Sequence, residues 1–354
     1  MTTDILEQRL RHAISPMINE NTPGMALLIA RGGETLFRGA CGMADLENRI
    51  PVRPEHQFAI ASNTKQFTCM AVMMLKEQGL LDYDQSVADF FPDFPDYRFR
   101  VTIRQLMNHQ GGIPDYTESQ DWLSRAKGAN ADTSEILEFI KDLGDLKFEP
   151  GTRFSYSNSG YVMLGRIVEL LSGVSFGRFL EDRIFAPVGM THACAPDTAA
   201  QRGASLTEGY QLTEDGGYQK QPYDMTLVGY ADGNIQATVD DILAWHRYLY
   251  MSQDESLVRR ETLKEAFEES YETDMAGLAY GFGLIHSRER GRREIWHSGG
   301  TMGFTSRCSR YPDDALSIIM LTNIQGLPKH QLYNRIADQV FALLDGNAGF
   351  EELD

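Results

Sequence analysis

The first feature of the chain is a short stretch with hydrophobic residues at helical spacing. Asp4 and Glu7 stand in the relation of a capping box, in which the two side chains accept from the first backbone amides of a helix. We therefore expect a helix that begins near Asp4 and covers one face of a sheet. Its apolar face would consist of Leu6, Leu10, Ile14, Met17 and Ile18.

Strand patterns gather near the two ends of the chain. Residues 24–31 and 34–40 are separated by Gly32 and Gly33, and this pattern is typical of a hairpin. A second group of strands is predicted near the end, followed by a helix over 328–344 with one apolar face. The strands of this second group are expected at 281–287, 294–297, 304–311 and 315–323.

The middle of the chain is mainly helical. Gly79, Gly144 and Gly173 stand where helices should end. The simplest organisation is a mixed α/β domain built from residues 1–60 and 275–354, interrupted by a mainly helical insertion over 61–274, with a site at their interface. The clearest helices of the insertion are predicted at 64–78, 102–108, 134–143, 159–171 and 239–250.

Composition and charge argue against several classes of partner. The 33 lysines and arginines against 50 aspartates and glutamates give a net charge of −17, and the absence of a basic run argues against a nucleic-acid partner. The longest apolar stretch, Cys69–Leu75, is far shorter than the roughly 20 residues that span a bilayer. The acidic N-terminus is unlike a signal peptide, so we expect a cytosolic protein without a membrane partner. The four scattered cysteines are expected to be reduced and to bind no metal.

Scans for common motifs exclude most cofactor enzymes. The chain has no phosphate-binding P-loop, no HExxH zinc helix and no GxGxxG dinucleotide turn, and we expect no cofactor. One GxSxG motif is centred on Ser175, but a helix is predicted before it, where a nucleophile elbow needs a strand. We interpret Gly173–Gly177 as a turn between helices.

The strongest chemical signal is Ser62 followed by Lys65 at the start of an apolar helix. Residues three apart share one face of a helix, so the amine would lie beside the hydroxyl. Apolar surroundings favour the neutral amine, which can act as a base. Ser124 and Lys127 have the same spacing but lie in a polar stretch, where a solvated helix face is the simpler interpretation.

A second signal is Tyr156 followed by Asn158, the only Y-x-N of the chain. A tyrosine held against a lysine can exchange a proton with a nucleophile and a leaving group, and an asparagine amide can bind a substrate amide. The structural alternative is a packed tyrosine and an asparagine that caps a helix.

The third signal follows a predicted strand, at His297, Ser298, Gly299 and Gly300. Small residues there would let a substrate backbone lie against the strand, and the Gly300 amide would be an oxyanion donor together with the Ser62 amide. His109 belongs to a similar H-x-G sequence, but it follows a helix, and we interpret it as a residue that orders a loop.

The three signals in this order make the chain resemble the superfamily of serine β-lactamases and penicillin-binding proteins. The resembling branch contains class C β-lactamases, D-alanyl-D-alanine carboxypeptidases, D-aminopeptidases and related esterases. The resemblance also covers residues 106–116, 149–152 and 233–241. It implies an α+β, β-lactamase-like fold with an antiparallel sheet flanked by the N- and C-terminal helices.

The resemblance implies a serine hydrolase that forms an acyl-enzyme on Ser62 and acts on a small amide or ester. Lys65 would be the partner of the nucleophile, Tyr156 the general base and acid, and Asn158 a ligand of the substrate amide. His297, Ser298 and Gly299 stand where the family usually has Lys-Thr-Gly, and a histidine is mostly neutral at pH 7, which weakens carboxylate recognition. The alternatives are an acyltransferase and a non-catalytic receptor of the same fold. The oligomeric state is left open.

Overall fold

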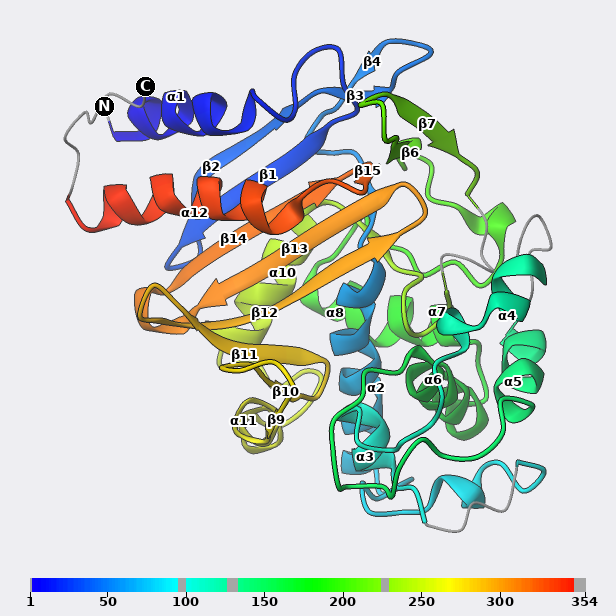
Figure 1. Ribbon diagram of the computed structural model, residues 1–354. Helices are drawn as coiled ribbons and strands as arrows, with labels where there is room; N and C mark the ends of the chain where they lie inside the picture. The colour runs from blue at the N-terminus through cyan, green and yellow to red at the C-terminus, as the bar shows by residue number, and fades with distance from the viewer. Residues whose placement is uncertain (1, 95–99, 126–132, 224–228, 347–354) are drawn as a thin grey trace.

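A single large sheet organises the computed structural model, which describes residues 2–94, 100–125, 133–223 and 229–346. The eight strands are hydrogen-bonded in the order β2-β1-β14-β13-β12-β11-β10-β9, and each neighbouring pair is antiparallel. The sheet therefore joins strands from both ends of the chain (Figure 1). The strands are β1 (Met25–Arg31), β2 (Glu34–Cys41), β9 (Tyr271–Glu272), β10 (Ala279–Gly281), β11 (Leu284–Glu289), β12 (Arg292–Thr301), β13 (Phe304–Tyr311) and β14 (Leu316–Thr322).

The predicted hairpin is confirmed, since Gly32 and Gly33 have φ angles of 59° and 85° in the turn between β1 and β2. Such positive angles favour glycine. Strands β13 and β14 are buried along their whole length, because helices cover both faces of the sheet at this point. The antiparallel sheet, with both terminal helices packed on it, confirms the predicted α+β, β-lactamase-like fold class.

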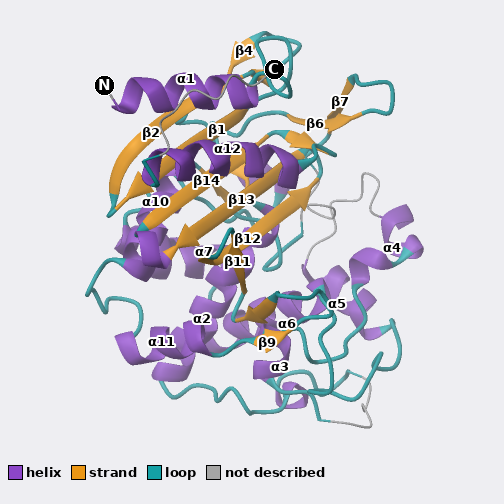
Figure 2. Cartoon of the chain, turned by 60° about the vertical axis from the view of Figure 1, so that its left-hand side comes forward, coloured by secondary structure: helices purple, strands orange, loops and turns teal. Residues whose placement is uncertain are grey.

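Helices α1 (Thr2–Ile14) and α12 (Lys329–Leu344) lie together on one face of the sheet (Figure 2). The first helix was expected to be capped at Asp4 and to carry Met17 and Ile18 on its apolar face, and the structure differs at both ends. It already begins at Thr2, so Asp4 lies in its first turn and does not cap it. It ends at Ile14 because Pro16 has no amide hydrogen and disfavours the helical conformation of the residue before it. Ile18 is nevertheless buried in the core below the helix.

The other face of the sheet carries the remaining helices. Helix α10 packs on β1 and β14, and α2 runs through the centre of the helical layer with residues 65–75 buried. The division of the chain into residues 61–274 and the two flanking segments stays a prediction. The helices on this side are α2 (Lys65–Glu77), α3 (Ile103–Met107), α4 (Gln120–Arg125), α5 (Thr133–Lys141), α6 (Asn158–Ser172), α7 (Phe176–Leu180), α8 (Ala186–Val188), α10 (Val239–Tyr250) and α11 (Arg260–Glu268).

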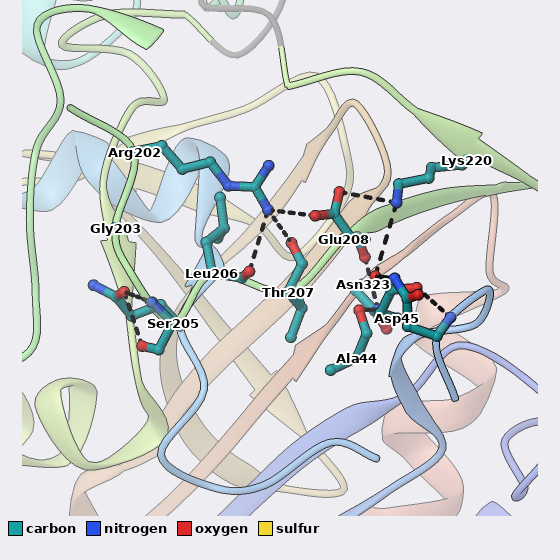
Figure 3. Close-up of polar contacts among 12 residues, drawn as sticks. Ala44, Asp45, Arg202, Gly203, Ser205, Leu206, Thr207, Glu208, Lys220 and Asn323 are labelled. Carbon is teal, nitrogen blue, oxygen red and sulfur yellow. Dashed lines mark hydrogen bonds and ion pairs between the residues drawn. The ribbon is translucent and has the colours of Figure 1, made fainter. Parts of the chain in front are cut away.

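Polar contacts join the sheet to the chain that returns from the helical layer (Figure 3). The Asn323 side chain accepts from the Gly24 amide and donates to the carbonyls of Ala44 and Glu208, so it connects three distant segments. Lys220 lies between the carboxylates of Glu208 and Asp45. The short strands of this region are β3 (Met43–Asp45), β4 (Ile50–Pro51), β5 (Phe58–Ala59), β6 (Gly209–Leu212), β7 (Tyr218–Gln221), β8 (Gln236–Ala237) and β15 (Ile324–Gln325).

All four cysteines are free thiols in the structure. In the part of the chain that the structure describes, no helix is long and apolar enough to cross a membrane.

Candidate active site

Ser62 lies on a strained turn between the sheet and the central helix. The turn is η1 (Ala61–Thr64), a 3-10 helix that continues into α2. Ala61 has a φ of 50°, in the left-handed region that residues with a side chain rarely adopt. Two hydrogen bonds fix the turn to β13: Asn63 Nδ2 donates to Ser306 Oγ at 2.9 Å, and Ser306 Oγ donates to the Ile60 carbonyl at 2.8 Å. The Ser62 side chain is partly exposed.

Lys65 is fully buried one turn beyond Ser62, and its ammonium meets three acceptors. Nζ donates to Ser62 Oγ at 3.2 Å, to Asn158 Oδ1 at 2.7 Å and to the Asp232 carbonyl at 2.8 Å. An ammonium has three hydrogens, so this environment satisfies it. The structure therefore brings the predicted Ser62, Lys65 and Asn158 together although they come from η1, α2 and α6.

The Tyr156 ring lies against this lysine, with its centroid 5.0 Å from Nζ. His109 holds the tyrosine loop in place. Its ring centroid lies 4.2 Å from that of Tyr156, and its Nδ1 accepts from the Ser157 amide at 3.0 Å. Burial lowers the pKa of His109 well below its usual value, so the ring is neutral and accepts this bond. His109 thus orders a loop, as predicted.

His297 is buried on β12, and both of its ring nitrogens have partners. A carbonyl only accepts, so the hydrogen is on Nδ1, which donates to the Ser298 carbonyl at 2.7 Å. Nε2 then accepts from the Tyr280 hydroxyl at 3.1 Å. Burial and the nearby Lys65 lower the pKa of His297 to about 3, and the ring is neutral at pH 7. The Ser298 hydroxyl accepts from Lys329 Nζ at 3.3 Å.

The glycines after His297 bring β12 against the serine turn. A Cβ on Gly299 would lie 2.2 Å from the Ile60 carbonyl oxygen, so only glycine allows this approach. A Cβ on Gly300 would meet no atom within 4 Å. In the described residues, pairing with β11 ends at Trp296, and residues 297–301 continue β12 with pairing to β13 alone. The sequence prediction had ended this strand at residue 297.

Several residues around Lys65 were not predicted as part of the site. The Asp115 carboxylate contacts Asn158, and the Asp232 carboxylate accepts from the Tyr116 hydroxyl at 3.0 Å. Burial raises the pKa of Asp232, and the charge of Lys65 opposes this rise. Residues 106–116 did attract attention as a motif, but no local pattern indicates that Asp115 contacts a residue 43 positions away.

The serines of the other two candidate motifs lie on other helices, away from Lys65. Ser175 accepts from the Arg178 amide as the N-cap of α7 and donates to Asp197, which agrees with a turn between helices. Ser124 is exposed on α4 and donates to the Gln120 carbonyl. Its predicted partner Lys127 lies outside the described residues.

Comparison with known proteins gives a consistent result. A family model described as Beta-lactamase matches residues 6–342. A penicillin-binding protein of Bacillus subtilis is 31% identical over 312 residues, which are 84% of this chain and 67% of that protein. A D-aminopeptidase of Brucella canis is 31% identical over 321 residues, which are 89% of this chain but only 58% of the relative.

Solved structures share the fold over nearly the whole chain. An octameric penicillin-binding protein homologue from Pyrococcus abyssi is 28% identical, with a TM-score of 0.82. The superposition covers 98% of this chain and 78% of the homologue. A D-amino acid amidase from Ochrobactrum anthropi has a TM-score of 0.83 at 23% identity, with 99% and 100% of the two chains covered. This second likeness concerns the fold alone.

Proposed function

The chain belongs to the β-lactamase family, and we propose that it is a serine hydrolase that forms an acyl-enzyme on Ser62 and acts on a small amide or ester. The supporting relatives are a penicillin-binding protein and a D-aminopeptidase. Since the chain spans only 58% of the D-aminopeptidase, the activity of that whole protein is not transferred.

One observation carries the proposal: the buried Lys65 ammonium contacts the Ser62 hydroxyl while two further acceptors fix it in place. A buried charge is costly without compensating partners, and the partners that this lysine has hold its Nζ beside the Ser62 hydroxyl. Among the described residues, the serines of the other two motifs, on α4 and α7, hydrogen-bond to groups other than a lysine.

In the proposed mechanism, Ser62 Oγ attacks the substrate carbonyl carbon. The hydroxyl proton passes to the deprotonated oxygen of Tyr156, whose negative charge the adjacent Lys65 ammonium stabilises, while Oγ forms a bond to the carbonyl carbon. The amides of Ser62 and Gly300 stabilise the oxyanion of the tetrahedral intermediate. Collapse of this intermediate breaks the bond to the amine or alcohol, which leaves with the proton from Tyr156.

Deacylation repeats these steps with water. Tyr156 takes a proton from water, the hydroxide attacks the acyl carbon, and Oγ of Ser62 regains a proton as the acid is released. The strand edge at His297 to Gly300 would bind the substrate backbone. Because His297 is neutral, it supplies no cation for a substrate carboxylate. A location in the cytosol stays a prediction, and the oligomeric state is open, although one solved homologue is octameric.

Variants of the three serines test the proposal. Ser62→Ala should abolish hydrolysis of a p-nitrophenyl ester, because the acyl group then has no acceptor. Ser124→Ala and Ser175→Ala are matched controls that remove the same hydroxyl group away from Lys65, and both should retain the activity. Loss of activity in a control variant, with Ser62→Ala active, would contradict the proposal.

A further inference from the structure

Two buried arginines on β13 differ in how their charges are compensated. Arg307 Nη2 donates to both carboxylate oxygens of Glu294, at 3.0 and 3.2 Å, on the side of the sheet that α12 covers. Arg310 is 3% exposed and lies on the opposite side, against α10. Its Nε and Nη1 atoms are buried without a hydrogen-bond partner, and within the described residues no carboxylate pairs with its guanidinium.

The C-terminal end of α10 lies over Arg310 and does not compensate its charge. The Arg310 Cζ atom is 5.4 Å from the centroid of the Tyr250 ring, at the last residue of this helix. The ring attracts a cation but leaves Nε and Nη1 without acceptors. A helix C-terminus carries partial negative charge, but the carbonyls of Tyr248 and Leu249 already accept from Arg260.

The neighbours of Arg310 on this face of the sheet are basic or neutral. Ser317 on β14 and Ile295 on β12 lie directly opposite it, and His286 on β11 is next in the same row. The Nε2 atom of His286 is also buried without a partner. His246 of α10 lies with Nδ1 3.1 Å from Ser317 Oγ. A chain with a net charge of −17 thus has a buried basic cluster at this place.

We propose that Arg310 is the centre of a binding site for a small inorganic oxyanion, such as phosphate. Arginine stays protonated in proteins, and a buried charge is costly without a counter-ion. The planar guanidinium has paired N–H donors that match two oxygens of such an anion. The Ser317 hydroxyl adds a donor from the opposite strand when His246 Nδ1 carries the hydrogen of the bond between them.

Arg293 connects this site to solvent. Burial and the charge of Arg293 lower the pKa of His286 to about 4, so the two side chains are close to each other. The Arg293 side chain is 55% exposed, and its ion pair with Asp313, at 3.5 Å, is exposed as well. Because exposed ion pairs contribute little free energy, an incoming anion can replace Asp313 as the partner of Arg293.

The site is separate from the one around Ser62. Ser306, which holds the serine turn through the Ile60 carbonyl, lies four residues before Arg310 on β13. Four residues of a strand span about 13 Å. Binding of an oxyanion at Arg310 therefore does not depend on the proposed hydrolysis, and either can fail without the other.

Equilibrium dialysis with radiolabelled inorganic phosphate, at an ionic strength held constant with sodium chloride, tests the proposal. Arg310→Met should bind one phosphate per chain less than the wild type, since methionine is of similar length but uncharged. Arg288→Met is the matched control, because it removes an exposed arginine of β11, and it should bind as the wild type does. No binding by the wild type, or equal binding by the wild type and Arg310→Met, would overturn the proposal.

Urea denaturation gives a second measurement on the same variants. In phosphate-free buffer, Arg310→Met should be at least as stable as the wild type, because it removes a buried charge that has no counter-ion. With phosphate at ten times its Kd, the unfolding equilibrium constant of the wild type should fall about elevenfold and that of Arg310→Met should not change. If Arg310→Met is destabilised equally with and without phosphate, the protein itself compensates the charge and the proposal is wrong.

Arg310→Lys keeps the proposal testable if the methionine variant does not fold. Lysine retains the positive charge but lacks the paired donors of the guanidinium. Its affinity for phosphate should be at least about tenfold lower than that of the wild type, the value of one charge-assisted hydrogen bond. An unchanged affinity in the dialysis experiment would contradict the binding of an oxyanion by the Arg310 guanidinium.

Discussion

At the scale of single residues, the site is built around one buried cation. Lys65 has no exposed surface, and its three acceptors come from a serine, an asparagine and a backbone carbonyl. A buried charge is costly unless well-placed partners compensate it. The Asp115 carboxylate accepts a hydrogen bond from the asparagine. Asp232 provides the backbone carbonyl, and its own carboxylate is fixed by a further hydrogen bond. Both aspartates thereby help to hold the partners of Lys65 in place.

Lys65 and Tyr156 should therefore act as one unit in proton transfer. We predict that Lys65→Ala and Tyr156→Phe each lower kcat for a p-nitrophenyl ester by about 10²- to 10⁴-fold, the usual contribution of general acid and base catalysis. The double variant should be little worse than either single variant. Kinetics of all four proteins provide the measurement, and multiplicative losses in the double variant would argue against a shared proton path.

At the scale of elements, the amphipathic helices and the hairpin could be predicted from the sequence, because their hydrophobic spacing depends on neighbours within a few residues. The continuation of β12 through Gly299 and Gly300 could not be predicted from the sequence. Glycine has low strand propensity, and what places it there is contact with η1, which lies more than 200 positions earlier. Ser62, Lys65 and Tyr156 were found through motif spacing, whereas Asp115 and Asp232 act through contacts that no local pattern contains.

The contact between β12 and η1 gives a prediction at this scale. Gly299→Ala should lower the free energy of unfolding by about 1–3 kcal/mol and reduce kcat, because its methyl group would lie 2.2 Å from the Ile60 carbonyl oxygen and push the strand away from Ser62. Chemical denaturation of the variant measures the first effect. Gly300→Ala is the control for stability, since its methyl group meets no atom within 4 Å. Equal stability of the two variants would show that the close approach is not needed.

At the scale of the whole molecule, both faces of one sheet are covered, and several histidines are buried as neutral rings. Burial and the charge of Arg310 lower the pKa of His246 to about 3, and burial together with Lys65 does the same for His297. In the unfolded chain these histidines bind a proton near pH 6.5. The unfolded state therefore binds more protons, and the folded state loses stability as the pH falls from about 6.5 toward 3.

His246 isolates this effect because it lies away from the site, with Nδ1 3.1 Å from Ser317 Oγ. Below pH 6.5 each such histidine should reduce the free energy of unfolding by about 1.4 kcal/mol per pH unit. We predict that His246→Asn, which keeps a polar group near Ser317, has a shallower decline between pH 6.5 and 5 than the wild type. Urea denaturation at several pH values gives both slopes. Identical slopes would contradict the assignment of His246 as a buried neutral ring.

The central claim is that Ser62 becomes acylated, and the most direct measurement is the mass of a covalent adduct. The protein is incubated with a fluorophosphonate, digested, and the modified peptide is sequenced by mass spectrometry. The account predicts one adduct on the peptide that contains Ser62, lost in Ser62→Ala and retained in Ser124→Ala and Ser175→Ala. An adduct on another serine, or an unmodified Ser62 in folded wild-type protein, would contradict the account.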